Sequence, residues 1–179
     1  MTGLMRAPRV HHVIQGTHHV AAGPDDVLTT VLGSCVSICL HDRGAGVGGM
    51  NHFLLPGDPK TNRGEARYGI NAMELLINAV LKAGGRAGAL EAKVFGGANA
   101  TGSRVPVGAL NAEFAFWFLR NEGIPCVARD VGGANARKLR YWPYSGQVQV
   151  MLLPEPARSV PQAAPPVQPA AAGEADLFI

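Results

Sequence analysis

The apolar residues of this chain follow two different periodic patterns. Residues 68–83 and 107–121 repeat apolar side chains every three or four positions, which is typical of helices with one buried face. Glycine-containing segments, residues 84–85 and 123–125, follow and end both stretches. Shorter runs rich in strand formers cover residues 36–40, 47–55, 92–95, 126–131, 138–142 and 147–153. The sequence therefore predicts two main helices and about six strands.

The order of these elements favours an α+β fold. Strands come first along the chain and mix with helices later, as in layered α/β domains. We expect one sandwich-like domain over residues 17–153, with mixed and largely antiparallel sheets. Residues 1–16 are expected to form a flexible lead-in. Residues 154–179 are dominated by Pro and Ala and predict a disordered tail, whose last residues, 174–179, are either a frayed end or a short docking peptide.

Composition narrows the classes of partner. Apolar residues make up 47% of the 179 residues, which is enough for a substantial core, whereas charged residues make up 16% and the net charge is +3. No run of Lys or Arg is interleaved with aromatic residues, so we expect no nucleic-acid partner. No window of about 20 residues is continuously apolar, and residues 1–10 lack an apolar signal core. We therefore expect a cytoplasmic protein without membrane insertion.

The chain has three cysteines, Cys35, Cys39 and Cys126. Thiols are normally reduced in the cytosol, so an odd and small number favours a reactive thiol over a disulfide framework. Two histidine doublets, residues 11–12 and 18–19, do not predict a metal site, because neighbouring side chains on a strand point to opposite faces. The glycine-rich segment 97–103 lacks the lysine of a phosphate-binding loop. We expect neither a metal nor another cofactor.

Strand pairing gives Cys35 a candidate partner. If Arg43-Gly44 is the two-residue loop of a hairpin, Asp42 faces Ala45 and, counting outward, Cys35 faces His52. Directly opposed residues have Cβ atoms about 4.5–5.5 Å apart, which brings a sulfur within reach of an imidazole. A different loop length would shift this register. In the same register Cys39 faces Gly48, which offers no base, so we expect Cys39 to be a packing residue.

A thiol and an imidazole together can hydrolyse an amide. A nearby imidazolium lowers the thiol pKa toward the reactive thiolate, and it can later protonate the leaving amine. Gly33 permits a tight turn before Cys35, where backbone N–H groups could hold an oxyanion. A third polar residue often orients the imidazole. Thr29, Thr30 and Asn51 are near enough in sequence, and spacing alone selects none of them.

These residues also resemble a known family. The chain is similar to the CheD family of chemoreceptor glutamine deamidases over roughly residues 17–153. The most specific matches are Leu32-Gly33-Ser34-Cys35-Val36 and Gly49-Met50-Asn51-His52-Phe53-Leu54-Leu55-Pro56. Further matches are Tyr68-Gly69, Lys93-Val94-Phe95-Gly96-Gly97-Ala98, Gly123-Ile124, Asp130-Val131-Gly132-Gly133 and Arg137-Lys138.

The resemblance implies a site and a substrate. The family's nucleophile falls on Cys35, its base on His52, and its third functional position on Thr29, six residues before the cysteine. The implied reaction converts glutamines of methyl-accepting chemotaxis receptors into glutamate and ammonia through a cysteine thioester. In some bacteria the family also binds a CheC-type phosphatase.

Several alternatives stay open from the sequence. The same thioester would serve a methylesterase acting on methylated receptor glutamates. A non-catalytic adaptor that binds receptor or phosphatase helices is the alternative from another class. Arg137 and Lys138 are either solvated charges at a strand end or a contact for an acidic receptor surface.

Overall fold

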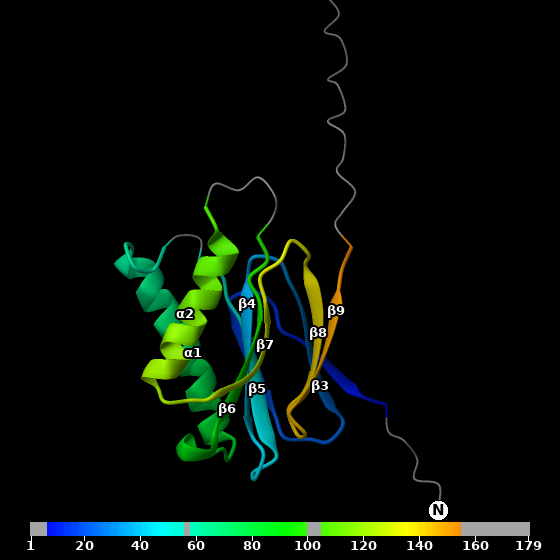
Figure 1. Cartoon of the computed structure of the whole chain (residues 1–179). Helices are drawn as coiled ribbons and strands as arrows, with labels where there is room; N and C mark the ends of the chain where they lie inside the picture. The colour runs from blue at the N-terminus through cyan, green and yellow to red at the C-terminus, as the bar shows by residue number, and fades with distance from the viewer. Residues whose placement is uncertain (1–6, 56–57, 100–104, 155–179) are drawn as a thin grey trace, which may run out of the picture.

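A computed structural model describes residues 7–55, 58–99 and 105–154 of the chain. The molecule has three layers, which Figure 1 shows from left to right: two helices, a five-stranded sheet and a four-stranded sheet. This arrangement confirms the predicted α+β, sandwich-like single domain with two main helices. The predicted tail lies outside the described residues from position 155 onward, as do residues 1–6 of the predicted lead-in.

The central layer is a mixed five-stranded sheet. Its strand order is β2-β5-β4-β6-β7, and β6 and β7 form its parallel pair. The strands are β2 (Thr17–Ala21), β5 (Val47–His52), β4 (Val36–Asp42), β6 (Glu91–Gly96) and β7 (Cys126–Val131). β4 and β5 are buried along their whole lengths, as expected for strands covered on both faces.

The outer layer is a four-stranded sheet of order β1-β3-β8-β9. Its strands are β1 (Arg9–His12), β3 (Asp26–Leu32), β8 (Arg137–Trp142) and β9 (Gln147–Leu152). β1 pairs in parallel with β3, and the other pairs are antiparallel. Among the described strands, the chain therefore crosses between the two sheets four times, between β1 and β2, β2 and β3, β3 and β4, and β7 and β8.

Two helices cover the open face of the central sheet. α1 spans Arg63–Lys82, and Asn62 caps it by accepting hydrogen bonds from the backbone N–H groups of Gly64 and Glu65. The prediction began this helix five residues too late, because apolar periodicity starts only after the polar first turn. α2 spans Val107–Asn121, which are the predicted bounds. A short 3-10 helix, Ala87–Ala89, links α1 to β6.

Each gap between layers holds its own apolar core. Between helices and central sheet lie residues such as Val36, Phe53, Leu76 and Phe118. Between the two sheets lies a smaller cluster of Val13, Leu28, Leu32, Cys39, Met50, Phe95, Leu139 and Tyr141, with the partly buried Cys35 packed against it. Burial in these two cores supplies the main stabilisation of the three-layer arrangement.

The structure corrects the expectation for the first residues. Part of the predicted lead-in, residues 9–12, forms β1, and Arg9 and His11 both contact the carboxylate of Asp26. The pattern missed β1 because three of its four residues are half-buried or exposed His and Arg, without an apolar alternation. The strand gains its order from parallel pairing with β3, which the local sequence does not reveal.

The predicted hairpin register was wrong by two residues. Asp42 pairs with Val47, so the loop spans residues 43–46 and has four residues instead of two. Asp42 stabilises this longer loop: its carboxylate accepts from the N–H of Ala45 and its carbonyl accepts from the N–H of Gly46. Gly46 has a φ of 62°, which favours glycine there, whereas Gly44 is not in a positive-φ conformation.

Candidate active site

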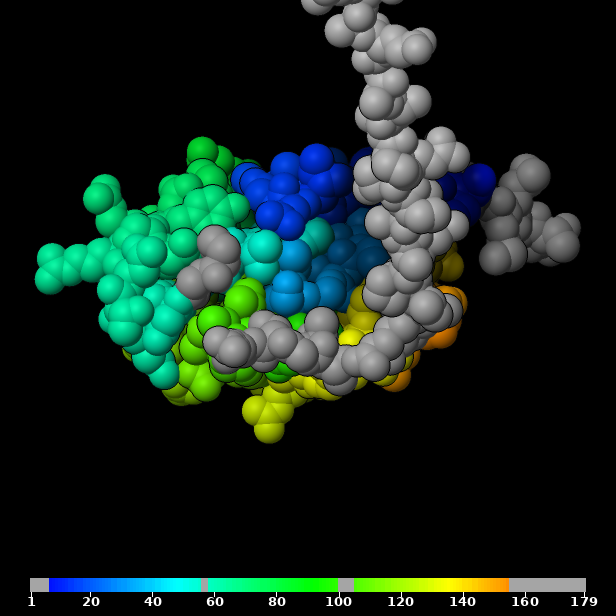
Figure 2. Space-filling view, turned by 90° about the horizontal axis from the view of Figure 1, so that it is seen from above, coloured from blue at the N-terminus to red at the C-terminus, as the bar shows by residue number. Residues whose placement is uncertain are grey.

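Cys35 lies in the connection between β3 and β4, where the chain passes from one sheet to the other. Figure 2 views this end of the molecule: the chain from β3 to β5, in blue to cyan, surfaces between the deep-blue β1–β2 segment and the green and yellow segments of α2 and β8. The Cys35 side chain is half-buried. A thiol at this position has both a packed side and an open side.

The corrected register still brings Cys35 and His52 to one face. Val36 and Phe53 pair through two backbone hydrogen bonds of 3.0 Å, and both side chains lie in the core under the helices. Because side chains alternate along a strand, the preceding residues, Cys35 and His52, point toward the other sheet. They are diagonal instead of directly opposed, a relationship of about 7–8 Å that long and aromatic side chains can bridge.

The pair is not hydrogen-bonded in this structure. Among the described residues, the Cys35 thiol donates to the side-chain oxygen Oε1 of Gln15, with Sγ and Oε1 3.5 Å apart. The Nε2 atom of His52 is buried and has no hydrogen-bond partner within the described part of the chain. A buried nitrogen without a partner is uncommon in proteins, and no donor of the described residues competes for it.

Thr30 on β3 holds the other nitrogen of His52. Its hydroxyl oxygen lies 2.7 Å from the carbonyl oxygen of Val13 and 2.9 Å from Nδ1 of His52. A hydroxyl has one proton to donate, and the Val13 carbonyl can only accept it. The Thr30 oxygen therefore accepts from Nδ1–H, and we assign the proton of neutral His52 to Nδ1. That tautomer leaves a lone pair on Nε2, as a general base requires.

Of the three candidate orienting residues, Thr30 is the one bonded to the imidazole. The Thr29 hydroxyl donates instead to the carbonyl of Leu139, at 2.7 Å, and so ties β3 to β8. The Asn51 side chain accepts from the N–H of Ile38, at 3.0 Å, and donates toward α1. Sequence spacing could not separate Thr29 from Thr30, because the choice depends on which strand face meets β5.

Burial shifts the pKa values of both reactive groups toward their neutral forms. Burial raises the pKa of the Cys35 thiol, and a hydrogen bond from its own backbone N–H opposes this only in part. Burial also lowers the pKa of His52, against a smaller opposite effect of the Val13 carbonyl. Both shifts favour the neutral forms, a protonated thiol and an uncharged imidazole, over the thiolate–imidazolium pair.

The other two cysteines have different surroundings. Cys39 is buried between the sheets, and burial raises its pKa far above the usual range, as expected for an inert packing residue. In the observed register it pairs with Met50, not with the predicted Gly48. Cys126 is exposed at the start of β7. Only Cys35 of these three cysteines lies in a connection between the two sheets, from β3 to β4.

Glycines on the neighbouring strand make room for the Cys35 backbone. Gly96, at the end of β6, has a φ of 109°, and a Cβ there would overlap the carbonyl oxygen of Cys35. Gly97 donates its N–H to that same carbonyl at 2.7 Å. Gly33, for which the sequence suggested a tight turn before Cys35, has no positive φ, and a Cβ there would meet open space. The close packing of the Cys35 backbone therefore depends on the glycines at the end of β6.

A buried arginine fixes the loops around this position. Arg137 is 3% exposed, and its Nη1 donates to the carbonyls of Gly96 and Asp130 at 2.6 and 2.7 Å. Its Nη2 donates to the carbonyl of Gly132 at 2.6 Å. Of the two charges proposed as a receptor contact, only Lys138 is exposed. The sequence missed the role of Arg137 because nothing in a strand pattern distinguishes a buried guanidinium from a solvated one.

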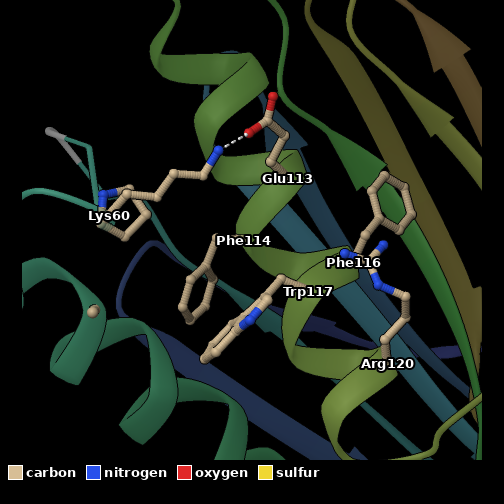
Figure 3. Close-up of a pocket in the computed structure, with 8 residues that line it drawn as sticks. Lys60, Glu113, Phe114, Phe116, Trp117 and Arg120 are labelled. Carbon is tan, nitrogen blue, oxygen red and sulfur yellow. Dashed lines mark hydrogen bonds and ion pairs between the residues drawn. The ribbon is translucent and has the colours of Figure 1, made fainter.

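Two hollows on the surface differ in their relation to these residues. One of about 330 Å³ is lined by Gln15, Thr29, Thr30 and His52, among others. A hollow of about 670 Å³ lies between α1 and α2, where Phe114 and Trp117 point from α2 toward α1 (Figure 3). Its lining includes neither Cys35 nor His52. The smaller hollow is lined by His52 and by Gln15, which contacts the Cys35 thiol, although Cys35 itself is not part of its lining.

Two further observations concern metals and membranes. Within residues 7–55, 58–99 and 105–154, no group of three or more His, Cys, Asp or Glu side chains could hold a metal ion. Neither described helix has both the length and the apolar character needed to span a bilayer.

Comparison with known proteins identifies relatives. The family model for "CheD chemotactic sensory transduction" matches residues 54–152. A protein of Caulobacter vibrioides called "Probable chemoreceptor glutamine deamidase CheD" is 51% identical over 178 residues, covering 97% of this chain and 95% of its own. Proteins with the same name from Agrobacterium fabrum and Rhizobium johnstonii are 54% and 55% identical, each covering 80% of this chain and 79% of their own.

A solved structure of a Neisseria meningitidis protein aligns with a TM-score of 0.46 and 13% identity over 72% of this chain and 65% of its own, which is too weak a likeness to carry an argument. The sequence relatives are decisive, because they share about half of all residues over most of both chains. The family model also covers more than half of the chain. The chain therefore belongs to the CheD family.

Proposed function

We propose that this protein is a chemoreceptor glutamine deamidase in which Cys35 is the nucleophile and His52 the general base. Its relatives bear the name of that activity, and their similarity extends over most of the chain. The substrates would be glutamine side chains of methyl-accepting chemotaxis receptors, and the products glutamate and ammonia. Because the substrate glutamines lie on the cytoplasmic part of such receptors, we also propose that this protein acts in the cytoplasm.

The observation that carries this proposal is the unpartnered Nε2 of His52. Thr30 holds Nδ1, so Nε2 carries a lone pair that no donor of the described residues engages. The imidazole lines the same hollow as Gln15, whose amide oxygen contacts the Cys35 thiol. The thiol and an amide carbonyl are thus in contact, and the imidazole lines the hollow beside that amide, an arrangement suited to amide hydrolysis through a thioester.

The reaction starts from neutral groups. As the Cys35 sulfur attacks the carboxamide carbon, Nε2 of His52 takes the thiol proton, and the carbonyl oxygen becomes an oxyanion. The backbone N–H of Cys35, which lies beside its own sulfur, is a candidate donor to that oxyanion. His52 then gives its proton to the departing ammonia, leaving a thioester. Nε2 next takes a proton from water, which attacks the thioester and releases glutamate.

Burial helps this sequence of proton transfers. The imidazolium and the oxyanion form only during attack, in a site that water solvates poorly. Hydrogen bonds to these charges are therefore stronger there than in water. The Thr30 hydroxyl, already bonded to Nδ1–H, stabilises the imidazolium when it forms. Thr29 stays a proposed member of the site in a positioning role: by fixing β3 to β8 at Leu139, its hydroxyl determines where the adjacent Thr30 lies.

A mass-spectrometric assay tests the proposal. Purified protein is incubated with receptor cytoplasmic fragments, and glutamine peptides are followed for the gain of about 1 Da that replacing NH₂ with OH produces. We expect the gain with wild type and with Cys126→Ala, whose thiol is exposed but distant in the fold, and no gain with Cys35→Ala or His52→Ala. An unchanged gain in Cys35→Ala would overturn the assignment of the nucleophile.

The same samples separate the alternatives. Release of methanol from methylated receptor fragments, without change at glutamine, would identify a methylesterase. Binding to receptor fragments without either product would identify an adaptor. We also propose a CheC-type phosphatase as a partner, and co-elution of the two proteins on a size-exclusion column tests this. We propose no nucleic-acid partner.

A further inference from the structure

A glutamine of the protein itself lies beside the proposed nucleophile. Gln15 lies in the short connection between β1 and β2, with its side chain exposed toward the candidate site. The amide oxygen Oε1 accepts a hydrogen bond from the Cys35 thiol, with Sγ 3.5 Å away. This is the functional group that the proposed reaction consumes, held beside the proposed nucleophile.

The connection that carries Gln15 is fixed at both ends to residues of the site. Before Gln15, the Val13 N–H donates to the Thr29 carbonyl at 2.9 Å, and the Val13 carbonyl accepts from the Thr30 hydroxyl. After it, the Gly16 N–H donates to the His52 carbonyl at 2.7 Å. Gly16 has a φ of 83°, a conformation that glycine adopts without strain. Gln15 is therefore presented to Cys35 by a connection of defined shape.

The groups needed for hydrolysis are all near this amide. Gln15 lines the hollow of about 330 Å³ together with His52 and Thr30, and the hollow is open to solvent water. The lone pair on Nε2 of His52 has no partner among the described residues. Holding a reactant next to a catalytic group makes the reaction effectively unimolecular and favours it strongly over the same reaction between separate molecules.

We propose that Gln15 is a substrate of the protein's own site and is converted in cis to glutamate. This inference rests on the proposed deamidase function. The Cys35 sulfur forms a bond to Cδ of Gln15 while His52 takes the thiol proton. The Cδ–N bond then breaks, and ammonia leaves with that proton. Water hydrolyses the resulting internal thioester, returns the thiol and leaves a carboxylate at position 15. The reaction consumes one water, releases one ammonia and changes no oxidation state.

The product has a consequence for the site. A carboxylate at position 15 faces the Cys35 thiol, and a like charge there disfavours formation of the thiolate. The protein would thus pass from a form with a neutral amide at its nucleophile to a form with a fixed negative charge. A receptor glutamine must displace either side chain from the thiol before it can react.

The sequence makes the test unambiguous. Trypsin cleaves after Arg9 and Arg43, and the peptide between them contains a single amide side chain, Gln15. A gain of about 1 Da on this peptide therefore reports conversion of Gln15, and a loss of about 17 Da reports an internal thioester between Gln15 and Cys35. The full-length protein is analysed directly after purification and again during incubation at neutral pH.

We expect residue 15 to become glutamate in wild type and in Cys126→Ala, and to stay glutamine in Cys35→Ala and His52→Ala. Gln147 and Gln149 on β9 serve as internal controls that stay unchanged. Conversion of Gln15 in Cys35→Ala as well would show spontaneous hydrolysis and overturn the inference. Because Cys35→Ala removes one partly buried sulfur, its folding is checked by thermal unfolding.

A parallel receptor assay separates the two proposals. Wild type that deamidates receptor fragments but keeps Gln15 intact would overturn self-deamidation and leave the proposed function standing. Wild type that modifies neither would overturn both. Mixing Cys35→Ala with wild type adds a test of the cis route: Gln15 of the variant chain stays intact if each chain modifies only itself.

Discussion

The Thr30 hydroxyl oxygen lies 2.9 Å from Nδ1 of His52, and the two residues belong to different sheets. Thr30 comes from β3 of the outer sheet, and His52 ends β5 of the central sheet. The contact determines which nitrogen of the imidazole carries the proton, because the Val13 carbonyl takes the only hydroxyl proton. The basicity at Nε2 thus depends on how the sheets are packed together.

Removal of the Thr30 hydroxyl tests this relationship. We expect Thr30→Val to lower kcat for receptor deamidation at least ~10-fold, because an unheld imidazole loses part of the catalysis that a positioned base supplies. KM should change little, and Thr30→Ser should restore most of the rate. The matched control is Thr29→Val, which removes the bond to Leu139. It should cost about 1–2 kcal/mol of unfolding free energy with a smaller effect on kcat. Equal kcat losses in the two variants would contradict the assignment of Thr30.

The pKa shifts predict the form of the pH–rate profile. Burial lowers the pKa of His52, so the base is protonated, and kcat/KM falls, only below pH 6.5. Burial raises the pKa of Cys35, so we expect the thiol to be protonated at pH 7. Ultraviolet absorbance of wild type minus Cys35→Ser should accordingly show no thiolate at pH 7. A strong thiolate band at that pH would instead indicate a resting thiolate–imidazolium pair.

Gly96 and Gly33 form a matched pair of substitutions. Gly96→Ala places a methyl group against the Cys35 carbonyl at a φ of 109°, so we expect loss of activity together with destabilisation of more than ~1 kcal/mol. Gly33→Ala meets open space without a positive φ and should retain both stability and activity. Thermal unfolding and the receptor assay measure the two effects. A harmless Gly96→Ala would show that the approach of β6 to Cys35 is not required.

We expect the hydrogen bonds of the Arg137 guanidinium, and not only its charge, to stabilise the fold. Arg137→Lys keeps the positive charge but loses the planar guanidinium fork that bonds three carbonyls, in β6, in β7 and just after β7, so we expect a loss of about 2–4 kcal/mol in unfolding free energy. Loosening of Gly96 should also slow alkylation or catalysis at Cys35. Arg129→Lys is the control, since Arg129 is exposed on β7 and surface changes usually cost less than about 0.5 kcal/mol. Denaturant titration of both variants decides between these outcomes.

The sequence predicted the helices and the central strands better than the register in which the strands pair. The apolar periodicity found both helices and the central strands, because burial on a defined face imposes that periodicity. The register of β4 and β5 was missed, because Arg43-Gly44-Ala45-Gly46 fits a loop of either two or four residues. The choice is made by the Asp42 carboxylate, which also binds Arg86 from the segment after α1. That contact is remote in sequence and leaves no local pattern.

The register argument that paired Cys35 with His52 was partly wrong. A shift of two residues keeps every side chain on its original face, so Cys35 and His52 still point to the same side of the sheet although they are not directly opposed. Gln15 and Val13 could not be placed by sequence, because β1 was expected to be unstructured. The lowered pKa of His52 could not be predicted either, since burial of this imidazole depends on the outer sheet.

The hydrogen bond between Thr30 and His52 crosses the seam between the sheets, and this has a consequence for how the protein loses activity. Proteins open in cooperative parts, and separate parts can have different free energies of opening. An excursion that parts the two sheets would release the imidazole while the strand ladders and helices persist. Inactivation by mild denaturant should therefore precede the loss of circular dichroism, and amide exchange at the seam should accelerate first.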